Sequence, residues 1–468
     1  MLKKIFTNSF GILISRILGF IRDLLTASIL GANIYSDIFF VAFKFPNLFR
    51  RIFAEGAFIQ SFLPSYIASK HKNRFAAAVF IRFFTIIFIF SILVTLFSPL
   101  FTKLIAFGFD EELINMASLY VAINFYYLDF IFIVTFLAAL LQYKEHFATT
   151  AFSTALLNLS LISALIIFQK SEKENIVFAM SIAVLIGGAL QVLIHLYISK
   201  KLNILKRLIL SLKGLNKKKE SVKEDLKKFY KNFVPAIFGN STAQISAFLD
   251  TWLASFLVSG SISYLYYANR ILQLPLALFA IATATALFPT VSKKLKDKKD
   301  KEAKEILKKS FWLLVFLLSL STVGAIVLSD EIIWLLFERG SFTGEDTKNT
   351  AFVLAMYMIG LLPYGLNKLF SLWLYANHKQ IIAAKIATYS LICNIVLSVI
   401  LIFYLQAAGL ALSTSIAGFV LLFLTIKEFG FKEFLSFLER KKILFLLFLI
   451  FLELFILHTF KNFLFLNQ

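Results

Sequence analysis

The chain has 468 residues, of which 59% are hydrophobic and 16% are charged, and its mean hydropathy is +0.81. A soluble domain is about half apolar and about a quarter charged, so this composition excludes an ordinary soluble protein and indicates a membrane protein. A net charge of +21 would suggest a nucleic-acid partner in a soluble protein. Here the basic residues lie mostly in short loops between apolar stretches, so we do not expect nucleic-acid binding.

About thirteen apolar stretches, each long enough to cross a bilayer, follow one another along the chain. They cover residues 5–31, 35–68, 76–106, 112–143, 147–169, 175–200, 229–258, 261–292, 309–329, 347–377, 379–404, 406–427 and 441–460. The basic start resembles a signal peptide, but no small-residue cleavage site follows, so we expect the first stretch to remain a span. The sequence therefore predicts an all-α, polytopic membrane protein.

Loop charges predict the topology. The connections rich in Lys and Arg are 70–74, 200–231, 293–309 and 427–442, whereas the opposite connections, 31–36, 110–112, 259–260 and 344–346, are short or acidic. Basic loops stay in the cytoplasm, so this pattern places the N-terminus there too.

The long basic connection also suggests the domain organisation. We predict an N-terminal lobe of six spans at 1–200, a basic cytoplasmic linker at 201–228, a C-terminal lobe at 229–428 and an extra span within 429–468. The halves show a faint repeat, because Asp23–Leu30 resembles Asp250–Leu257 and each is followed by a span with an early proline, Pro46 or Pro275. A parallel repeat of six spans is a recurrent transporter plan, with chance similarity as the alternative.

The first two stretches carry an unusual number of charges. These are Arg16, Arg22, Asp23, Asp37, Lys44, Arg50, Arg51 and Glu55. A charge at the centre of a membrane helix costs about 2.5–3.5 kcal/mol, so these groups should face a wet cavity or pair with one another. We expect Asp37 near the outer end, and Arg51 with Glu55 has the i,i+4 spacing of an ion pair within a helix.

Three of these arginines suggest an anionic substrate. Arg16 and Arg22 are six residues apart, so an unbroken helix would not align them, and we expect Gly19 to bend the helix, as Pro46 does before Arg50. Arginine binds phosphate bidentately and stays charged in a low dielectric, which favours phosphate or pyrophosphate as the ligand. The alternative interpretation is a set of interfacial anchors and internal salt bridges.

The second half adds Arg270, within Tyr266–Arg270, with no acid inside one helical turn. We interpret other polar groups in the spans as helix–helix hydrogen bonds; they are Asn240, Gln244, Asp250, Asn367 and Lys368. The histidines are scattered without ligand spacing and no Walker-type loop occurs, so we expect neither a metal site nor an enzyme.

Two segments carry a family resemblance. Ser15–Asp23 and Phe45–Phe58 resemble the MurJ (or MviN) lipid II flippase family of the multidrug/oligosaccharidyl-lipid/polysaccharide exporter superfamily. Tyr266–Arg270 and Gly409–Ser415 give weaker support, and the resemblance runs in order to about residue 428.

The resemblance implies two six-helix lobes around a central cavity in the bacterial inner membrane. Such proteins move undecaprenyl-pyrophosphate-linked peptidoglycan precursor from the cytoplasmic to the periplasmic leaflet by alternating access. The resemblance implies that the substrate-binding residues are Arg16, Arg22, Arg50 and Arg270. It further implies that the gating or supporting residues are Asp37, Asn47 and Glu55, and we group Asp23 and Arg51 with them. It also implies lipid II as the partner, a monomer, no bound cofactor, and coupling to sodium or to membrane potential.

The chain departs from the family pattern in its number of spans, and its function has several alternative interpretations. The family typically has fourteen spans, and the last two bind the lipid tail, but residues after 428 have room for about one full span. The alternatives are a related polysaccharide-lipid flippase, a multidrug exporter or a membrane enzyme acting on polyprenyl phosphates. Such an enzyme should show clustered acids or a metal-binding motif, and we find neither in the sequence.

Overall fold

The computed structural model describes residues 2–51, 57–213 and 222–465, and these residues are mainly helical with no strand among them. Nine helical stretches in these ranges are long and apolar enough to cross a membrane. One of them contains two spans, as described below. The prediction of an all-α, polytopic membrane protein is confirmed.

The helices form two compact units. The first unit is Met1–Gly260 with Arg339–Ser341, and the second is Ser261–Glu338 with Phe342–Gln468. The segment 201–228 contains a short helix, α10 (Ile204–Lys213), and its residues 214–221 lie outside the described part. α11 (Lys223–Ala254) follows this segment and packs with the first unit. The predicted lobe boundaries stay a prediction.

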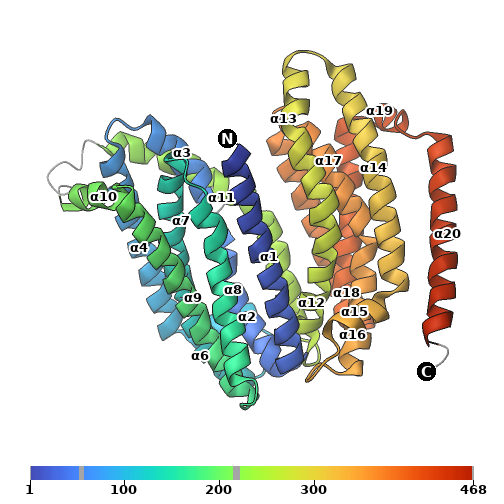
Figure 1. The fold of residues 1–468 in the computed structure, drawn as a ribbon, viewed down its shortest axis with the longest axis horizontal. Coiled ribbons are helices and arrows are strands. Elements are labelled where there is room, and N and C mark those ends of the chain that lie inside the picture. Colours follow the sequence, from blue (N-terminus) through green and yellow to red (C-terminus); the bar gives the residue numbers. More distant parts are fainter. Residues whose placement is uncertain (1, 52–56, 214–221, 466–468) are drawn as a thin grey trace. The chain divides into compact units, whose positions relative to one another are not determined.

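The first unit contains, besides α10 and α11, nine helices. They are α1 (Leu2–Leu30), α2 (Ile34–Phe49), α3 (Ala57–Ala68), α4 (Lys72–Leu96), α5 (Ser98–Ile105), α6 (Glu111–Phe125), α7 (Tyr127–Tyr143), α8 (Ala148–Phe168) and α9 (Lys173–Lys201). α8 lies alongside both α1 and α9 (Figure 1). α2 begins with a capping box, in which the Asn33 side chain accepts the N–H of Tyr35 and the Ser36 hydroxyl accepts that of Asn33.

The span predicted for 35–68 corresponds to α2, a π-helical turn and α3 in the described part of the chain. Pro46 lies inside α2, where it lacks the N–H that would continue the helical ladder. Residues 50 and 51 then form a wider π-helical turn, and 52–56 lie outside the described residues. The bend expected at Pro46 before Arg50 stays a prediction.

Aromatic rings join α3, α4, α7 and α11 in the interior of the first unit. The ring centroid of Phe58 lies 5.0 Å from that of Phe62, 5.5 Å from that of Phe132 and 6.2 Å from that of Phe229. Such pairs contribute about 0.5–1.5 kcal/mol each beyond their burial. The phenylalanine-rich composition therefore serves the interior of this unit as well as surfaces that face lipid.

A main-chain contact holds residues 339–341 against the start of the chain's first loop. The N–H of Ser341 donates to the carbonyl of Ser28 at 2.7 Å. Gly31 and Gly340 both have positive φ angles, +81° and +61°. A Cβ at Gly31 would overlap the Ser341 carbonyl, and one at Gly340 would overlap the Ser28 carbonyl, so this contact needs glycine at both positions.

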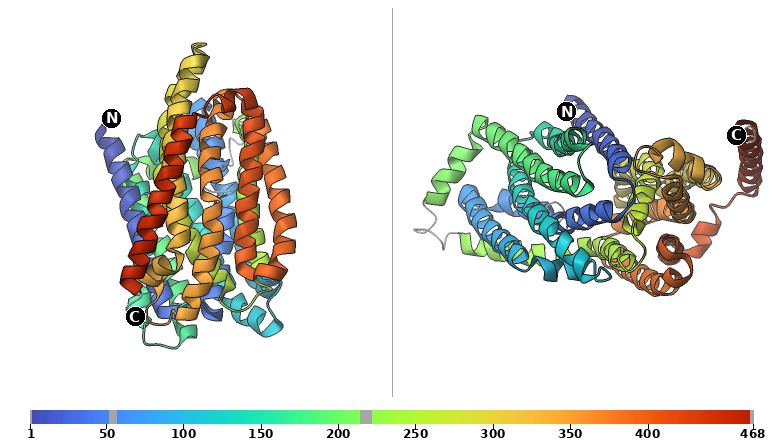
Figure 2. Two further views of the ribbon diagram at one scale, coloured as in Figure 1. Left: turned by 90° about the vertical axis from the view of Figure 1, so that its right-hand side faces the viewer. Right: turned by 90° about the horizontal axis from the view of Figure 1, so that it is seen from below.

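The second unit begins with α12 (Ser261–Pro275), which continues through η3 (Leu276–Ile281) into α13 (Ala282–Lys296). The remaining helices are α14 (Asp300–Val327), α15 (Ser329–Phe337), α16 (Gly344–Ile359), α17 (Leu361–Ala376), α18 (Gln380–Phe429), α19 (Phe431–Leu435) and α20 (Arg440–Phe465). α13 and α14 extend together beyond their neighbours, carrying the basic connection between them (Figure 2).

α18 contains two spans. Its backbone leaves the helical region at Gln406, with φ +49° and ψ −128°. The hydroxyl of Ser390 donates to the carbonyl of Ala417 at 2.8 Å, so the two halves pack side by side in opposite directions. This agrees with the two stretches predicted at 379–404 and 406–427.

α20 is the extra span predicted at 441–460, and it stands at the edge of the second unit (Figure 2). Lys461 near its end pairs with Glu331 at 2.9 Å. Near its start, Lys308 pairs with Glu439 at 3.0 Å, and the Trp312 indole donates to the carbonyl of Phe437 at 2.8 Å. Polar contacts at both ends therefore fasten α20 to the unit.

Candidate functional site

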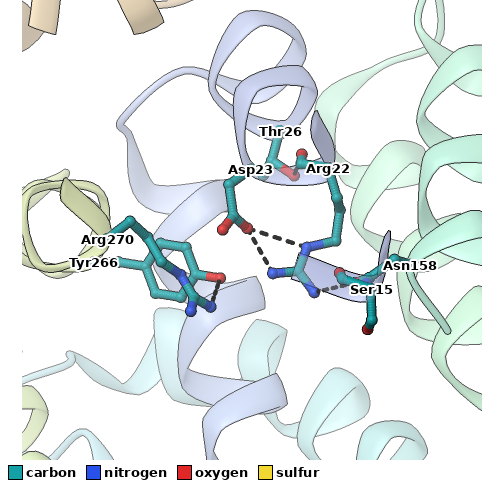
Figure 3. Close-up of polar contacts among 7 residues, drawn as sticks. All are labelled: Ser15, Arg22, Asp23, Thr26, Asn158, Tyr266 and Arg270. Carbon is teal, nitrogen blue, oxygen red and sulfur yellow. Dashed lines mark hydrogen bonds and ion pairs between the residues drawn. The ribbon is translucent and has the colours of Figure 1, made fainter. Parts of the chain in front are cut away.

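Arg22 is a buried arginine held by side chains from two helices (Figure 3). Its guanidinium pairs with the adjacent Asp23 at 2.6 Å and donates through Nη1 to the amide oxygen of Asn158 on α8 at 3.0 Å. Asn158 in turn donates to the carbonyl of Ser15, about two turns before Arg22 on α1, at 3.0 Å. Arg22 is 7% exposed, so its orientation is fixed before any ligand arrives.

α1 continues without interruption through Gly19, where the sequence predicts a bend. The helix runs from Leu2 to Leu30, and a Cβ at Gly19 would lie 3.5 Å from Nδ2 of Asn158. Gly19 therefore makes room for the asparagine that holds Arg22. Six residues of unbroken helix turn the Arg16 and Arg22 side chains about 120° apart around the axis.

Arg16 lies at a different surface of the first unit. It is exposed and lines a cavity of about 330 Å³ between α1 and α8, together with Ile12, Ser15, Thr150, Ala151 and Thr154. The structure thus separates the two arginines that the sequence placed together, one buried in a polar network and one at a cavity wall.

The residues at the end of α2 have mixed surroundings. The Asn47 side chain donates to the carbonyl of Phe43 at 2.6 Å, which ties it to its own helix. Arg50 is half-buried in the π-helical turn and Arg51 is exposed. Glu55, the predicted partner of Arg51, lies outside the described residues.

Asp37 and Lys44 connect α2 to α11 and to the residues after it. The Asp37 carboxylate accepts the N–H of Gly260 at 2.7 Å and is 2% exposed. Lys44 donates to the hydroxyl of Thr251 on α11. The sequence pointed to the charge of Lys44 but not to its partner.

Arg270 lies on a polar stripe of α12 in the second unit. Its guanidinium donates to the Tyr266 hydroxyl at 2.6 Å and lies 4.7 Å from that ring's centroid (Figure 3). Asn269 and Gln273, on the same face, hydrogen-bond to each other. A guanidinium carries five N–H donors, and stacking on an aromatic ring uses none of them.

Asn158 is the site residue that sequence reasoning missed. It lies 136 residues from Arg22, and a lone asparagine in an apolar stretch carries no signal of its own. Within the described residues, no three His, Cys, Asp or Glu side chains gather as a metal site would require. The guanidinium groups of Arg22 and Arg270 are of a type that can bind an anion.

Comparisons with known proteins agree on one family. The family model described as "Lipid II flippase MurJ" matches residues 26–467. A protein named "Probable lipid II flippase MurJ" from Helicobacter pylori strain J99 is 50% identical over 445 residues, which cover 93% of this chain and 97% of that protein. A protein of the same name from Buchnera aphidicola subsp. Acyrthosiphon pisum is 34% identical over 464 residues, 96% of this chain and 88% of its own length.

Solved structures show the same fold. A structure titled "Lipid II flippase MurJ, inward closed conformation" matches with a TM-score of 0.78 and 26% identity, covering 97% of this chain and 98% of that one. An inward-facing multidrug resistance transporter of the MATE family matches with a TM-score of 0.68 and 12% identity, covering 92% and 98%. The second likeness is one of fold alone.

Proposed function

Because the chain belongs to the MurJ family of lipid II flippases, we propose that it moves lipid II from the cytoplasmic to the periplasmic leaflet of the bacterial inner membrane. The transport proceeds by alternating access, with the N-terminus in the cytoplasm. It is driven by sodium or by membrane potential, and the working form is a monomer.

The strongest support for this proposal is the environment of Arg22. A buried guanidinium in an apolar span must be stabilised, and here Asp23 and Asn158 fix its orientation. A guanidinium fixed in this way loses little side-chain entropy when it binds phosphate oxygens bidentately. Arg22 therefore binds the pyrophosphate of lipid II, with Arg16, Arg50 and Arg270 as further contacts.

The test compares Arg22→Ala and Arg270→Ala with Arg82→Ala. Arg82 is an exposed arginine of α4 outside the site, so it controls for loss of a positive charge from a span. Losing a charge-assisted hydrogen bond costs about 1.5–3 kcal/mol, which predicts at least about a tenfold loss of lipid II translocation for the first two variants. Arg82→Ala should transport normally.

Translocation is measured in spheroplasts as the fraction of lipid II that a membrane-impermeant, headgroup-cleaving enzyme can reach. Protein amounts in the membrane are matched first. Wild-type translocation rates in both site variants would remove these arginines from the mechanism.

A further inference from the structure

Lys368 stands apart from the other polar residues in the spans of the second unit. Its neighbour Asn367 accepts a hydrogen bond from Thr425 on α18 at 2.8 Å, as a helix–helix contact should. Lys368, in the middle of α17, is exposed, and no hydrogen bond or ion pair joins it to any of the described residues. The sequence-based interpretation of Lys368 as a helix–helix contact is therefore wrong.

The exposed face of α17 is polar. Its only exposed residues are Lys368 and Tyr375, while its Leu and Phe side chains, Leu362 excepted, are buried. α20 shows the opposite pattern, with Phe451 70% and Phe455 63% exposed, as a helix that faces lipid should. The open face of α17 is therefore suited to water or to a polar ligand, and not to lipid chains.

The position of Lys368 relative to Arg270 follows from two contacts within this unit. The Tyr264 hydroxyl on α12 bonds to Asp346 on α16 at 3.1 Å, and further along both segments Ala280 of η3 approaches Gly365 of α17. The segment from α12 to η3 and the segment from α16 to α17 therefore run in the same direction.

At about 1.5 Å per residue, Arg270 lies about 15 Å before Ala280, and Lys368 lies about 4.5 Å past Gly365. The two cations are thus roughly 15–20 Å apart along the helices, which is too far for one phosphate group to bridge. Lys368 is the nearer of the two to the end where the basic connection follows α13.

We propose that Lys368 is a second anion-binding position of this protein, which takes an anionic group of the lipid-linked substrate at a level distinct from that of Arg270. The inference rests on the proposed function. An ammonium is a compact charge with three donors and suits a phosphate or a carboxylate oxygen equally. An unpaired ammonium in a span is costly, and an anionic ligand would provide the partner that no described residue provides.

The test uses purified full-length protein and two probes, lipid II and undecaprenyl pyrophosphate, whose binding is measured by native mass spectrometry. The variants are Lys368→Gln and Lys368→Arg, with Lys385→Gln as the matched control, because Lys385 is an exposed lysine of the next helix that also lacks a partner among the described residues. Lys368→Gln should bind lipid II about tenfold more weakly, and Lys368→Arg should restore binding.

Lys368→Gln should melt at the wild-type temperature, since no hydrogen bond within the fold is lost. Weaker binding of both probes assigns the pyrophosphate to Lys368, and weaker binding of lipid II alone assigns a carboxylate of its headgroup. Wild-type affinity for both probes in Lys368→Gln would overturn the inference. If Arg22→Ala still loses transport in that case, the proposed function stands without it.

Discussion

At the scale of single residues, the carboxylate of Asp37 accepts a hydrogen bond from the main chain. It accepts the N–H of Gly260, the last residue of the first unit's continuous segment, where φ is +94°. A buried N–H without an acceptor is costly, so the acid stabilises the connection between α11 and α12. Asp37, which the family resemblance groups with gating or supporting residues, therefore has a structural contact at the end of this segment.

We predict that Asp37→Ala lowers the free energy of unfolding by about 1–3 kcal/mol, because the N–H of Gly260 loses its acceptor. Asp37→Asn should lose less, since a carboxamide oxygen still accepts. Thermal unfolding in detergent measures both. Asp330→Ala is the control, because Asp330 also lies in the first turn of a helix but is exposed. An equal loss in the control would assign the effect to the helix dipole and contradict the prediction.

The candidate site was partly predictable from sequence. Charges in apolar stretches identified Arg22 and Arg270, and the i,i+4 spacing of Tyr266 and Arg270 places them on one helix face. The partnership of Arg22 with Asn158 needs the packing of α8 on α1, for which no local spacing gives a sign. Local contacts can be predicted from the sequence, and contacts between distant helices cannot.

At the scale of elements, α20 depends on ion pairs at its start. Glu439 precedes the helix and pairs with Lys308 at 3.0 Å and with Lys442 at 3.1 Å. Hydrogen bonds from Lys308 and then Lys442 hold the pKa of the Glu439 carboxyl below its ordinary value of 4.5. The contribution of Glu439 to docking is therefore fully present above that ordinary value and is lost as the pH falls through the lowered pKa.

We predict that acidification below pH 4.5 loosens the α19–α20 connection, and that Trp312 reports it, because its indole donates to the carbonyl of Phe437. The emission spectrum is recorded in a variant that keeps Trp312 as its only tryptophan. The Glu439→Gln variant should already show at neutral pH the Trp312 emission spectrum that the unsubstituted protein shows after acidification. It should then show no acid transition at this position. An unchanged acid transition in Glu439→Gln would show that another group is responsible.

Hydropathy predicts where spans exist better than where helices end. It placed one span at 35–68, where the structure shows α-helix as far as Phe49 and a π-helical turn at residues 50 and 51. Hydropathy averaged over a bilayer thickness does not resolve such a local change of helix type. The two spans within α18 were predicted as separate apolar stretches at 379–404 and 406–427, and the backbone leaves the helical region where they meet, at Gln406.

At the scale of the whole molecule, the loop charges give a topology that can be tested directly. After Cys393 is replaced by Ala, single cysteines are introduced at His71, Glu111, Asp297 or Glu345, all of which are exposed. A membrane-impermeant maleimide should label the variants at Glu111 and Glu345 in spheroplasts. It should reach those at His71 and Asp297 only after the membrane is opened. Labelling of His71→Cys in sealed spheroplasts would reverse the proposed orientation.

The overall fold was largely predictable, because composition and apolar length alone require a bundle of membrane helices. The division between units at Gly260 and Ser261 had no such signal. A basic loop reports the side of the membrane on which it lies, and it does not report which helices pack together. The placement of α11 with the first unit is decided by packing, including the rings around Phe229.

The contact between Ser28 and Ser341 has a further consequence for this molecule. It is made by main-chain atoms and by two glycines, so it contains no ionisable group. Neither acidity nor ionic strength can therefore change its strength directly, whereas both act on the ion pairs of α20. The hydrogen bond between Ser28 and Ser341 should therefore have the same strength in fresh water and in brine.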